Sequence, residues 1–315
     1  MGKCISIFPE SSLSNRYLEI QKSIHKSNGF KISPTPRSFA SLIELLKVQR
    51  VNRIIVINWL EDISCSKGAG FFFLNFFWLV LVRFVYSKVI YVKHNLNPHS
   101  SKGIYYYKIM SYALNCMSDV KVAHRPFKGF NYVPHPTYSE KNDDFVLNGR
   151  RTIENLFLGQ IKPYKGVLEL ITNWPDNMEL LIVGECADFE LDSQIREFVN
   201  NKSNINYINK FVSDYDYEYY LSQAKRVVLS HLANSMLVSG TFYHAASLGC
   251  NIIMNEGGFY DYCKSKFSFV TGMDSINLFS NESVPAYVVM EEIRNECGHG
   301  NVAAYWANLF DSSIC

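Results

Sequence analysis

The sequence predicts an α/β protein made of two doubly wound, Rossmann-like domains that face a cleft. Its 315 residues suffice for two domains, and a hydrophobic content of 48% lets each domain bury its own core. Short apolar runs alternate with helical stretches in both halves of the chain, which is typical of parallel sheets covered on both faces. A polar segment over 139–151 separates the two halves.

The first half carries the elements of an N-terminal domain, which we place over 1–140. Four apolar, mostly β-branched runs are expected to be strands: Cys4–Phe8, Arg53–Asn58, 89–93 and Val120–Ala123. A helix is expected over 38–49, where Leu42, Leu45 and Leu46 recur at helical spacing. Because the strand runs are continuous rather than alternating, they indicate a sheet with helices on both sides.

An aromatic segment, 71–82 (FFFLNFFWLVLV), lies between the second and third of these strands and is followed by Arg83. A membrane-spanning helix needs roughly 20 apolar residues, so this segment is too short to cross a bilayer unaided. It is either a buried core helix or an interfacial helix whose Phe72, Phe76 and Trp78 enter the headgroup layer. Phe, Tyr and Trp make up 15% of the chain, and this excess favours membrane contact.

The alternation resumes after a linker over 141–151 and defines a C-terminal domain over 152–285. Its expected strands are again apolar runs: Ile153–Leu158, 180–183, 205–208, 227–230 and Asn251–Met254. Helices are expected between them over 166–173 and 192–200. The remaining residues, 286–315, are expected to form a helical segment that packs back on the N-terminal domain.

Composition and missing motifs exclude several classes of protein. Thirty-one Lys and Arg against 29 Asp and Glu leave a net charge of +2, which argues against a nucleic-acid partner. Neither G-x-G-x-x-G nor G-x-x-x-x-G-K-[ST] occurs, so dinucleotide and P-loop enzymes are disfavoured and we expect no cofactor. The eight cysteines form no C-x-x-C pair and no secretory signal is visible, which indicates reduced thiols and the cytoplasm.

Four polar clusters follow the expected strands, at the edge of the sheet where open α/β sheets bind ligands. They cover 58–62, 94–99, 133–138 and 160–166. The last cluster opens a helix at Lys165 and Gly166, and free N–H groups at a helix start favour an anion. With Lys162 nearby, this turn is expected to bind a diphosphate, and a solvated basic turn is the alternative.

These clusters resemble the motifs of the GT-B glycosyltransferases, which use sugar nucleotides. The segment 157–171 (FLGQIKPYKGVLELI) carries the resemblance. More specifically, the chain resembles the bacterial exopolysaccharide group of the xanthan-type β-1,4-mannosyltransferase. The HWPE motif of that group is matched by Asn58-Trp59-Leu60-Glu61, HNLxPHE by 94–100, PHGHY by 134–138 and NSGxLLxALSLxxPV by 239–251, in the same order along the chain.

The resemblance implies a GT-B fold and the transfer of a hexose, with mannose as precedent, from a sugar nucleotide to a lipid-linked oligosaccharide in bacterial surface polysaccharide synthesis. It also implies a cytoplasmic enzyme associated with the inner face of the plasma membrane. Many retaining relatives carry two glutamates where this chain has Met236 and His244, which favours an inverting reaction here. Asn58 and Ser100 are two further departures, from the His of HWPE and the last Glu of HNLxPHE.

The resemblance also assigns roles to individual residues. An inverting transfer needs a general base, for which Glu61 is the candidate and a helix-capping carboxylate the alternative, while His94 is expected to orient the substrate. The residues expected to bind the donor diphosphate and nucleotide are Lys162, Lys165, Gly166, Ser239, Gly240 and His244. Those expected to bind the acceptor are Trp59, Asn95, His99 and His135. Asp214-Tyr215-Asp216 has the D-x-D form of a metal site, but Ser213 before it predicts a helix start, so no metal is expected.

Two alternatives to this function stay open. The first is a soluble transferase that acts on a free or protein-bound glycan. The second is a noncatalytic, sugar-nucleotide-binding partner subunit of another glycosyltransferase, which the departures at Asn58, Ser100 and Met236 would explain. Transfer from a panel of sugar nucleotides by the isolated chain separates an enzyme from such a subunit.

Overall fold

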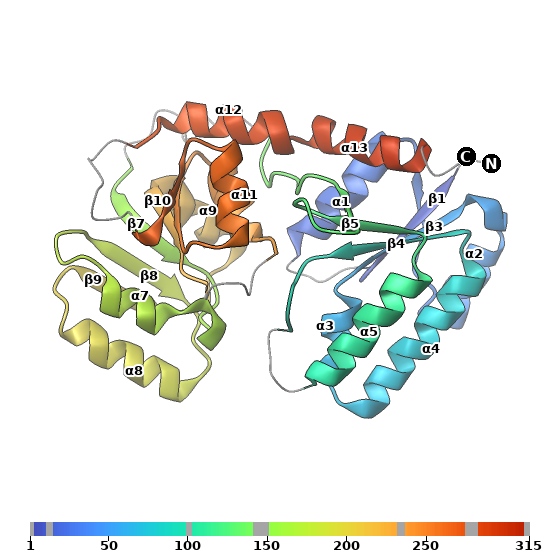
Figure 1. Cartoon of the computed structure of the whole chain (residues 1–315), viewed down its shortest axis with the longest axis horizontal. Coiled ribbons are helices and arrows are strands. Elements are labelled where there is room, and N and C mark those ends of the chain that lie inside the picture. Colours follow the sequence, from blue (N-terminus) through green and yellow to red (C-terminus); the bar gives the residue numbers. More distant parts are fainter. Residues whose placement is uncertain are drawn as a thin grey trace. The chain divides into compact units, whose positions relative to one another are not determined.

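The computed structural model describes residues 3–10, 15–98, 103–140, 151–231, 237–274 and 283–311, except for the side chain of Phe39. The chain divides into two compact units, Met1–Pro136 with Cys297–Cys315 (unit 1) and Thr137–Glu296 (unit 2). Each unit contains one six-stranded parallel sheet with helices on both faces (Figure 1). The predicted fold class, α/β with two doubly wound domains, is therefore confirmed.

Unit 1 has the strand order β2-β1-β3-β4-β5-β6, and every neighbouring pair is parallel. Its strands are β1 (Cys4–Phe8), β2 (Lys31–Ile32), β3 (Arg53–Asn58), β4 (Lys88–Lys93), β5 (Val120–Ala123) and β6 (Asn131–Tyr132). All residues of β1 and β3 are buried because both faces of the sheet are covered. This double burial explains why the two runs are apolar without alternation.

The helices of unit 1 divide between the two faces of its sheet. They are α1 (Arg16–Ser27), α2 (Phe39–Leu46), α3 (Leu60–Cys65), α4 (Ala69–Val85), α5 (Ile104–Met117) and α13 (His299–Asp311), with a 3-10 turn at Arg50–Asn52. Figure 1 shows α2, α4 and α5 on one side and α1 and α13 on the other. The chain moves from β1 to β2 in one direction along the sheet and from β3 to β5 in the other, so right-handed crossovers produce this division.

Helix α13 is held on α1 by rings and by one hydrogen bond. The ring of His25 packs against those of Trp306 and Phe310, with centroids 4.9 and 5.8 Å away. Asn28 Nδ2 donates a hydrogen bond of 2.8 Å to the carbonyl of Ala303. The last helix of the chain is thus part of unit 1, whereas the helix before it belongs to unit 2.

The aromatic segment forms α4, a helix of 17 residues with a buried and an exposed stripe. Phe72 and Trp78 lie on the buried stripe, where the Trp78 ring is 4.7 Å from that of Phe8. The prediction that these two residues contact a membrane is therefore wrong, because their rings fill the core under the sheet; Phe76 is partly buried against the same core. Among the described residues, no helix has the length and apolar character that a bilayer crossing needs.

Unit 2 has the strand order β12-β11-β10-β7-β8-β9, again with parallel neighbours. Its strands are β7 (Ile153–Leu158), β8 (Leu180–Gly184), β9 (Ile205–Asn209), β10 (Ala224–Leu229), β11 (Asn251–Met254) and β12 (Val270–Gly272). Its helices are α7 (Val167–Asn173), α8 (Phe189–Asn200), α9 (Asp214–Gln223), α10 (Gly240–Ser247), α11 (Gly258–Lys266) and α12 (Ala286–Cys297). The strand order reverses between β7 and β10, and open sheets bind ligands at such a switch point.

Two helices of unit 2 start at side-chain caps. Helix α9 follows Ser213 as predicted, since Ser213 Oγ accepts a hydrogen bond of 3.1 Å from the N–H of Asp216. The D-x-D sequence is therefore the first turn of a helix. Helix α8 starts earlier than expected because Asp188 caps it through two backbone hydrogen bonds. In the described part of the chain, no three His, Cys, Asp or Glu side chains are placed to hold a metal ion together.

Candidate functional site

The loop after β7 lies at the switch point of unit 2 and depends on two glycines. Gly159 has a φ of +122°, which side chains rarely adopt, and a Cβ on Gly184 would lie 2.0 Å from the Gly159 carbonyl oxygen. The Gly159 N–H donates to the Val183 carbonyl (3.1 Å), and the Ile161 N–H donates to the Glu185 carbonyl (2.8 Å). Both β7 and β8 therefore need glycine where they meet this edge of the sheet.

Lys165 reaches back over this loop. A Cβ on Gly159 would lie 3.5 Å from Lys165 Nζ and 4.0 Å from the ring of Tyr217. Burial, together with the charge of Lys162, lowers the pKa of Lys165 to about 8. No carboxylate of the described residues forms an ion pair with Lys165. A bound anion would supply the stabilisation that this ammonium group lost with its water.

The helix start predicted at Lys165 and Gly166 differs in detail from the structure. A 3-10 turn, Pro163–Lys165, comes first, and Gly166 joins it to α7 in a left-handed conformation with a φ of 64°. No side chain caps α7, so its first N–H groups have no side-chain acceptor. Lys165, the last residue of this turn, has its Nζ beside Gly159.

A stack of three rings connects this loop to α10. Tyr217 donates a hydrogen bond of 3.2 Å to Thr241 Oγ1, and its ring stacks on His244 with centroids 5.2 Å apart. The His244 ring also stacks on Tyr138, at 4.8 Å with 12° between the planes. A Cβ on Gly240 would lie 2.8 Å from the Tyr138 hydroxyl, so glycine is needed there. The structure thus brings the predicted Lys165, Gly240 and His244 together through Tyr217 and Thr241, which the sequence analysis missed.

Ser239, which precedes α10, and His244 within it are both buried. Ser239 precedes the helix in an extended conformation, and its side chain makes no capping bond. His244 packs on the tyrosine rings with its Nε2 3.7 Å from Glu218 Oε1. The predicted contact of His244 with a ribose is not supported by this packing. Glu218, whose side chain is half exposed, is the neighbouring group that a ligand could reach.

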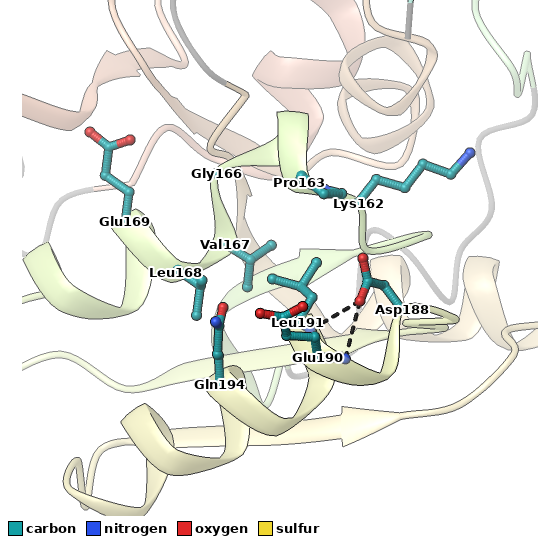
Figure 2. Close-up of a pocket in the computed structure, with 10 residues that line it drawn as sticks. All are labelled: Lys162, Pro163, Gly166, Val167, Leu168, Glu169, Asp188, Glu190, Leu191 and Gln194. Atoms are coloured by element: carbon teal, nitrogen blue, oxygen red, sulfur yellow. Dashed lines mark hydrogen bonds between the residues drawn. The ribbon is translucent and has the colours of Figure 1, made fainter. Parts of the chain in front are cut away.

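A cavity of about 360 Å³ opens between α7 and α8 (Figure 2). It is lined by Lys162, Pro163, Gly166, Val167, Leu168, Glu169, Asp188, Glu190, Leu191 and Gln194. Figure 2 shows Gln194 and Glu190 of α8 facing Leu168 of α7, while Asp188 binds the backbone of its own helix. The cavity therefore offers carboxylate and amide groups that suit a ligand rich in hydroxyl groups.

A second cavity, of about 350 Å³, lies at the ends of β10, β11 and β12. It is lined by Glu169, Leu170, Asn173, Ser230, Asn255, Met273 and Asp274. Ser230 Oγ donates a hydrogen bond of 2.7 Å to the Lys165 carbonyl, so this cavity adjoins the lysine turn. Asn255 Nδ2 donates to the Ser230 carbonyl at 3.0 Å and fixes the end of β11 beside it.

In unit 1, residues after β3 and β4 form one buried hydrogen-bond network. Asn58 Nδ2 donates to the Phe8 carbonyl (3.0 Å) and to Gln21 Oε1 (3.2 Å), and Asn58 Oδ1 accepts from His94 Nε2 (3.0 Å). The Trp59 ring stacks on His94 at 4.1 Å, and Trp59 itself has a φ of 53°. The structure therefore brings together two predicted site residues, Trp59 and His94, and Asn58, the departure from the resembling motif.

His94 belongs to a buried cluster of three histidines. Burial and the imidazoles of His124 and His135 hold the pKa of His94 well below its usual range. His124 Nδ1 donates to the Val133 carbonyl (2.9 Å), so its Nε2 accepts from the Tyr17 hydroxyl (2.9 Å). The predicted substrate contacts of His94 and His135 conflict with this burial, because both rings are covered by protein. His124 was not predicted from the sequence, although it directly follows β5 as His94 directly follows β4.

Glu61, the predicted base, has no exposed surface. Its Oε1 accepts a hydrogen bond of 2.6 Å from the Tyr91 hydroxyl, and its Oε2 has no hydrogen-bond partner. Burial, and secondarily the charge of Asp62, raise the pKa of Glu61 to about 7. The Glu61 carboxylate is closed to solvent in this structure, and its role as the general base stays a prediction.

Asp62, which was not predicted from the sequence, is the residue of this pair that has exposed surface, although its Oδ1 is buried without a hydrogen-bond partner. Its Oδ2 accepts a hydrogen bond of 2.8 Å from Asn95 Nδ2, and the Tyr107 hydroxyl donates to the Asn95 carbonyl (2.9 Å). Burial raises the pKa of Asp62 to about 6, although the bond from Asn95 and the charge of Lys93 act against the rise. Asn95 thus orients a carboxylate, while the predicted His99 lies outside the described residues.

No protein-family model and no curated protein sequence matches the chain. Its fold is similar to that of AviGT4, a glycosyltransferase involved in avilamycin A biosynthesis, with a TM-score of 0.61 and 12% identity over 98% of this chain and 97% of that one. The catalytic domain of starch synthase IV from Arabidopsis thaliana, bound to ADP and acarbose, is similar with a TM-score of 0.57 and 10% identity, over 97% of this chain and 79% of that one. A protein assigned as a UDP-N-acetylglucosamine 2-epimerase from Listeria monocytogenes is similar with a TM-score of 0.54 and 10% identity, over 98% of this chain and 97% of that one. The chain therefore has the GT-B fold that its motifs implied.

Proposed function

We propose that the chain is a glycosyltransferase that moves a hexose from a sugar nucleotide to a lipid-linked oligosaccharide, with inversion at the anomeric carbon. The observation that carries this proposal is Lys165, which is desolvated, has no carboxylate partner among the described residues and lies at the switch point of unit 2. Such a cation gains strongly from an anion, and the nucleotide diphosphate is the anion that the motif resemblance supplies.

The donor diphosphate binds Lys165 and Lys162, and the N–H groups at the start of α10 bind further oxygens. As the bond between the anomeric carbon and the diphosphate breaks, negative charge grows on the leaving group, and these groups stabilise it more than the intact donor. The Tyr217 ring lies against the same glycine as Lys165, and its hydroxyl bonds Thr241 at the start of α10, so this pair helps to shape the diphosphate site. Two lysines and a helix start supply the positive charge, so this scheme needs no metal ion.

We assign the general base for the acceptor hydroxyl to Asp62 of unit 1. In an inverting transfer the acceptor oxygen attacks the anomeric carbon, its proton moves to the base, and the electron pair of the broken bond leaves with the diphosphate. A pKa of about 6 makes Asp62 a stronger base than an exposed aspartate and still leaves it ionised at neutral pH. Asn95 holds the carboxylate through its 2.8 Å hydrogen bond.

The acceptor, the hexose and the location complete the proposal. The resemblance to the xanthan-type group supports mannose as the hexose, a lipid-linked oligosaccharide as acceptor and a role in bacterial surface polysaccharide synthesis. A cytoplasmic chain at the inner face of the plasma membrane would meet that acceptor. Exposed apolar side chains on α4 support a membrane contact there.

A noncatalytic partner subunit remains the second candidate. The burial of Glu61 and His94 favours it, because two positions that match family motifs are closed to substrate. Such a subunit binds a sugar nucleotide through Lys165 and leaves the donor intact.

Titration of the isolated chain with UDP-, GDP- and ADP-hexoses tests the proposal. We expect Lys165→Ala to lower the affinity roughly ten- to hundredfold, since a charge-assisted hydrogen bond contributes about 1.5–3 kcal/mol. Lys202→Ala is the matched control, because Lys202 lies in the same unit and pairs with Asp176 instead. If no sugar nucleotide binds, or if both variants lose affinity equally, the donor site is wrong.

The fate of the bound donor then separates the candidates. Release of nucleoside diphosphate with transfer to lipid extract, or slow hydrolysis to free sugar, supports the transferase. Binding without turnover in the presence of membrane extract supports the partner subunit. Conversion to an epimeric sugar nucleotide contradicts both.

A further inference from the structure

The outward side of α4 and α5 carries large apolar side chains in contact with solvent. On α4 the exposed fractions are 55% for Phe73, 68% for Leu74, 69% for Phe77 and 72% for Phe84. On α5 they are 78% for Tyr105 and 72% for Tyr112. These six residues are called the outer apolar face below.

The six residues belong to one surface because of how the two helices pack. Helices α4 and α5 cover the same side of the unit 1 sheet (Figure 1), and Phe72 of α4 stacks on Tyr106 of α5 at 4.9 Å. Both helices turn their buried stripes toward the sheet, so their exposed stripes point away from it. Positions 73, 77 and 84 follow helical spacing along α4, as 105 and 112 do along α5.

The charged residues of α4 and α5 are all cationic. Neither α4 nor α5 contains an Asp or Glu residue. Lys108 is exposed on α5, and Lys67, also exposed, precedes α4 with its Nζ 5.3 Å from the Phe71 ring centroid. Within the described residues neither lysine forms an ion pair, whereas Arg83 is paired with Asp119 at 3.1 Å. An apolar centre with a cationic rim complements a surface of anionic headgroups over hydrocarbon.

We propose that the outer apolar face docks on an anionic bilayer, with Phe73, Phe77 and Phe84 inserted below the headgroups and Lys67 and Lys108 on lipid phosphates. Tyr105 and Tyr112 suit the boundary layer, because each carries a polar hydroxyl on an apolar ring. A second copy of the chain fits this face less well, because two such faces would bring their cationic rims together. Docking of this kind would bring the chain to the lipid-linked acceptor. Only this link to the acceptor rests on the proposed function.

Vesicle flotation of the full chain tests the docking without donor or acceptor. The vesicles are phosphatidylcholine alone and phosphatidylcholine mixed with phosphatidylglycerol. We expect the wild-type chain to float with the mixed vesicles, and the variant Phe77→Ser/Phe84→Ser to partition roughly tenfold less for each phenylalanine removed. Phe189→Ser is the matched control, because Phe189 is 86% exposed but lies on α8 of unit 2. We expect it to bind as the wild-type chain does.

A charge variant tests the cationic rim separately. Lys67→Gln/Lys108→Gln should lower partitioning into the mixed vesicles by about fivefold per lysine and leave binding to phosphatidylcholine alone unchanged. The substituted residues are exposed, so unchanged circular dichroism is expected and excludes unfolding as the cause.

Two results would overturn the proposal. Equal flotation of the wild-type chain and the phenylalanine variant would show that these rings do not enter lipid. A wild-type chain that ignores both kinds of vesicle, but whose light-scattering mass falls from dimer to monomer on Phe77→Ser/Phe84→Ser, would make the face a contact between two copies of the chain. Either result leaves donor binding through Lys165 untouched, so failure of the docking and failure of the proposed function are distinguishable.

Discussion

Replacing His25 with leucine should stabilise unit 1. The side chain has no exposed surface, and neither ring nitrogen has a hydrogen-bond partner. An unpaired polar group in the interior costs about 1–3 kcal/mol, and leucine keeps most of the contacts with Trp306 and Phe310. We therefore expect His25→Leu to raise the free energy of unfolding by about 1–3 kcal/mol.

The same substitution should reduce the pH dependence of stability. Burial lowers the pKa of His25 from 6.5 to about 3. Between these values the unfolded chain binds a proton that the folded chain excludes, so the folded state loses about 1.4 kcal/mol per pH unit as the pH falls below about 6.5. Burial also lowers the pKa of His124, to about 4, so His124 makes stability fall with pH in the same direction. His25→Leu should therefore remove only the contribution of His25 to the slope of unfolding free energy against pH, and the contribution of His124 should remain.

Urea unfolding followed by circular dichroism at about pH 7.5, 6.5 and 5.5 measures both effects. Asn28→Ala is the control, because it removes the bond to the Ala303 carbonyl on the same helix and carries no titrating group. It should lower stability by about 1 kcal/mol at every pH. If His25→Leu is less stable than the wild-type chain, or keeps the full wild-type slope, the reasoning from an uncharged and unpaired ring is refuted.

Three further predictions concern the proposed sites. Gly184→Ala should destabilise unit 2 by about 2–3 kcal/mol in thermal unfolding, because its Cβ would lie 2.0 Å from the Gly159 carbonyl oxygen; an unchanged melting temperature would contradict this. Sugar-nucleotide affinity measured by calorimetry should fall about tenfold per pH unit above about pH 8, where Lys165 loses its proton, and Lys165→Ala should show no such fall. Asp62→Asn should lower kcat roughly 10²–10⁴-fold with little change in donor Kd, whereas Glu61→Gln should cost much less; the reverse order in a transfer assay would restore Glu61 as the base.

The strands were predictable where both of their faces are buried, because such strands have continuous apolar sequences. Cys4–Phe8 and Arg53–Asn58 are covered on both sides, and continuous apolar runs result. The strands β2, β6 and β12 were missed because two or three residues carry no pattern. Helix α4 poses a different problem. Phe77 and Trp78 are equivalent in a segment that is apolar all round, and only packing against Phe8 decides that Trp78 faces inward.

The lysine turn of unit 2 was predictable because its signal is local. Lys165 and Gly166 directly follow a recognisable strand, and the placement needs no knowledge of distant residues. Tyr217 was not predictable in the same way, since α9 meets the loop after β7 only once the chain has crossed to β9 and returned. Whether a side chain is exposed to solvent also depends on residues that are distant in sequence. Glu61 and Asp62 are adjacent in sequence, yet Glu61 lies under Tyr91 and Asp62 is partly exposed.

The hydrogen bonds of Asn58 give this position, where the chain departs from the motif that it resembles, a structural role in unit 1. An asparagine amide donates and accepts at once, so Asn58 binds the Phe8 carbonyl of β1, Gln21 of α1 and His94 after β4 together. A single imidazole at position 58 has two ring nitrogens and could not satisfy all three partners. Asparagine at this position therefore links the ends of β1, β3 and β4 with helix α1. The acid–base step is therefore assigned beyond these hydrogen bonds, to Asp62, which has exposed surface, in place of the fully buried Glu61.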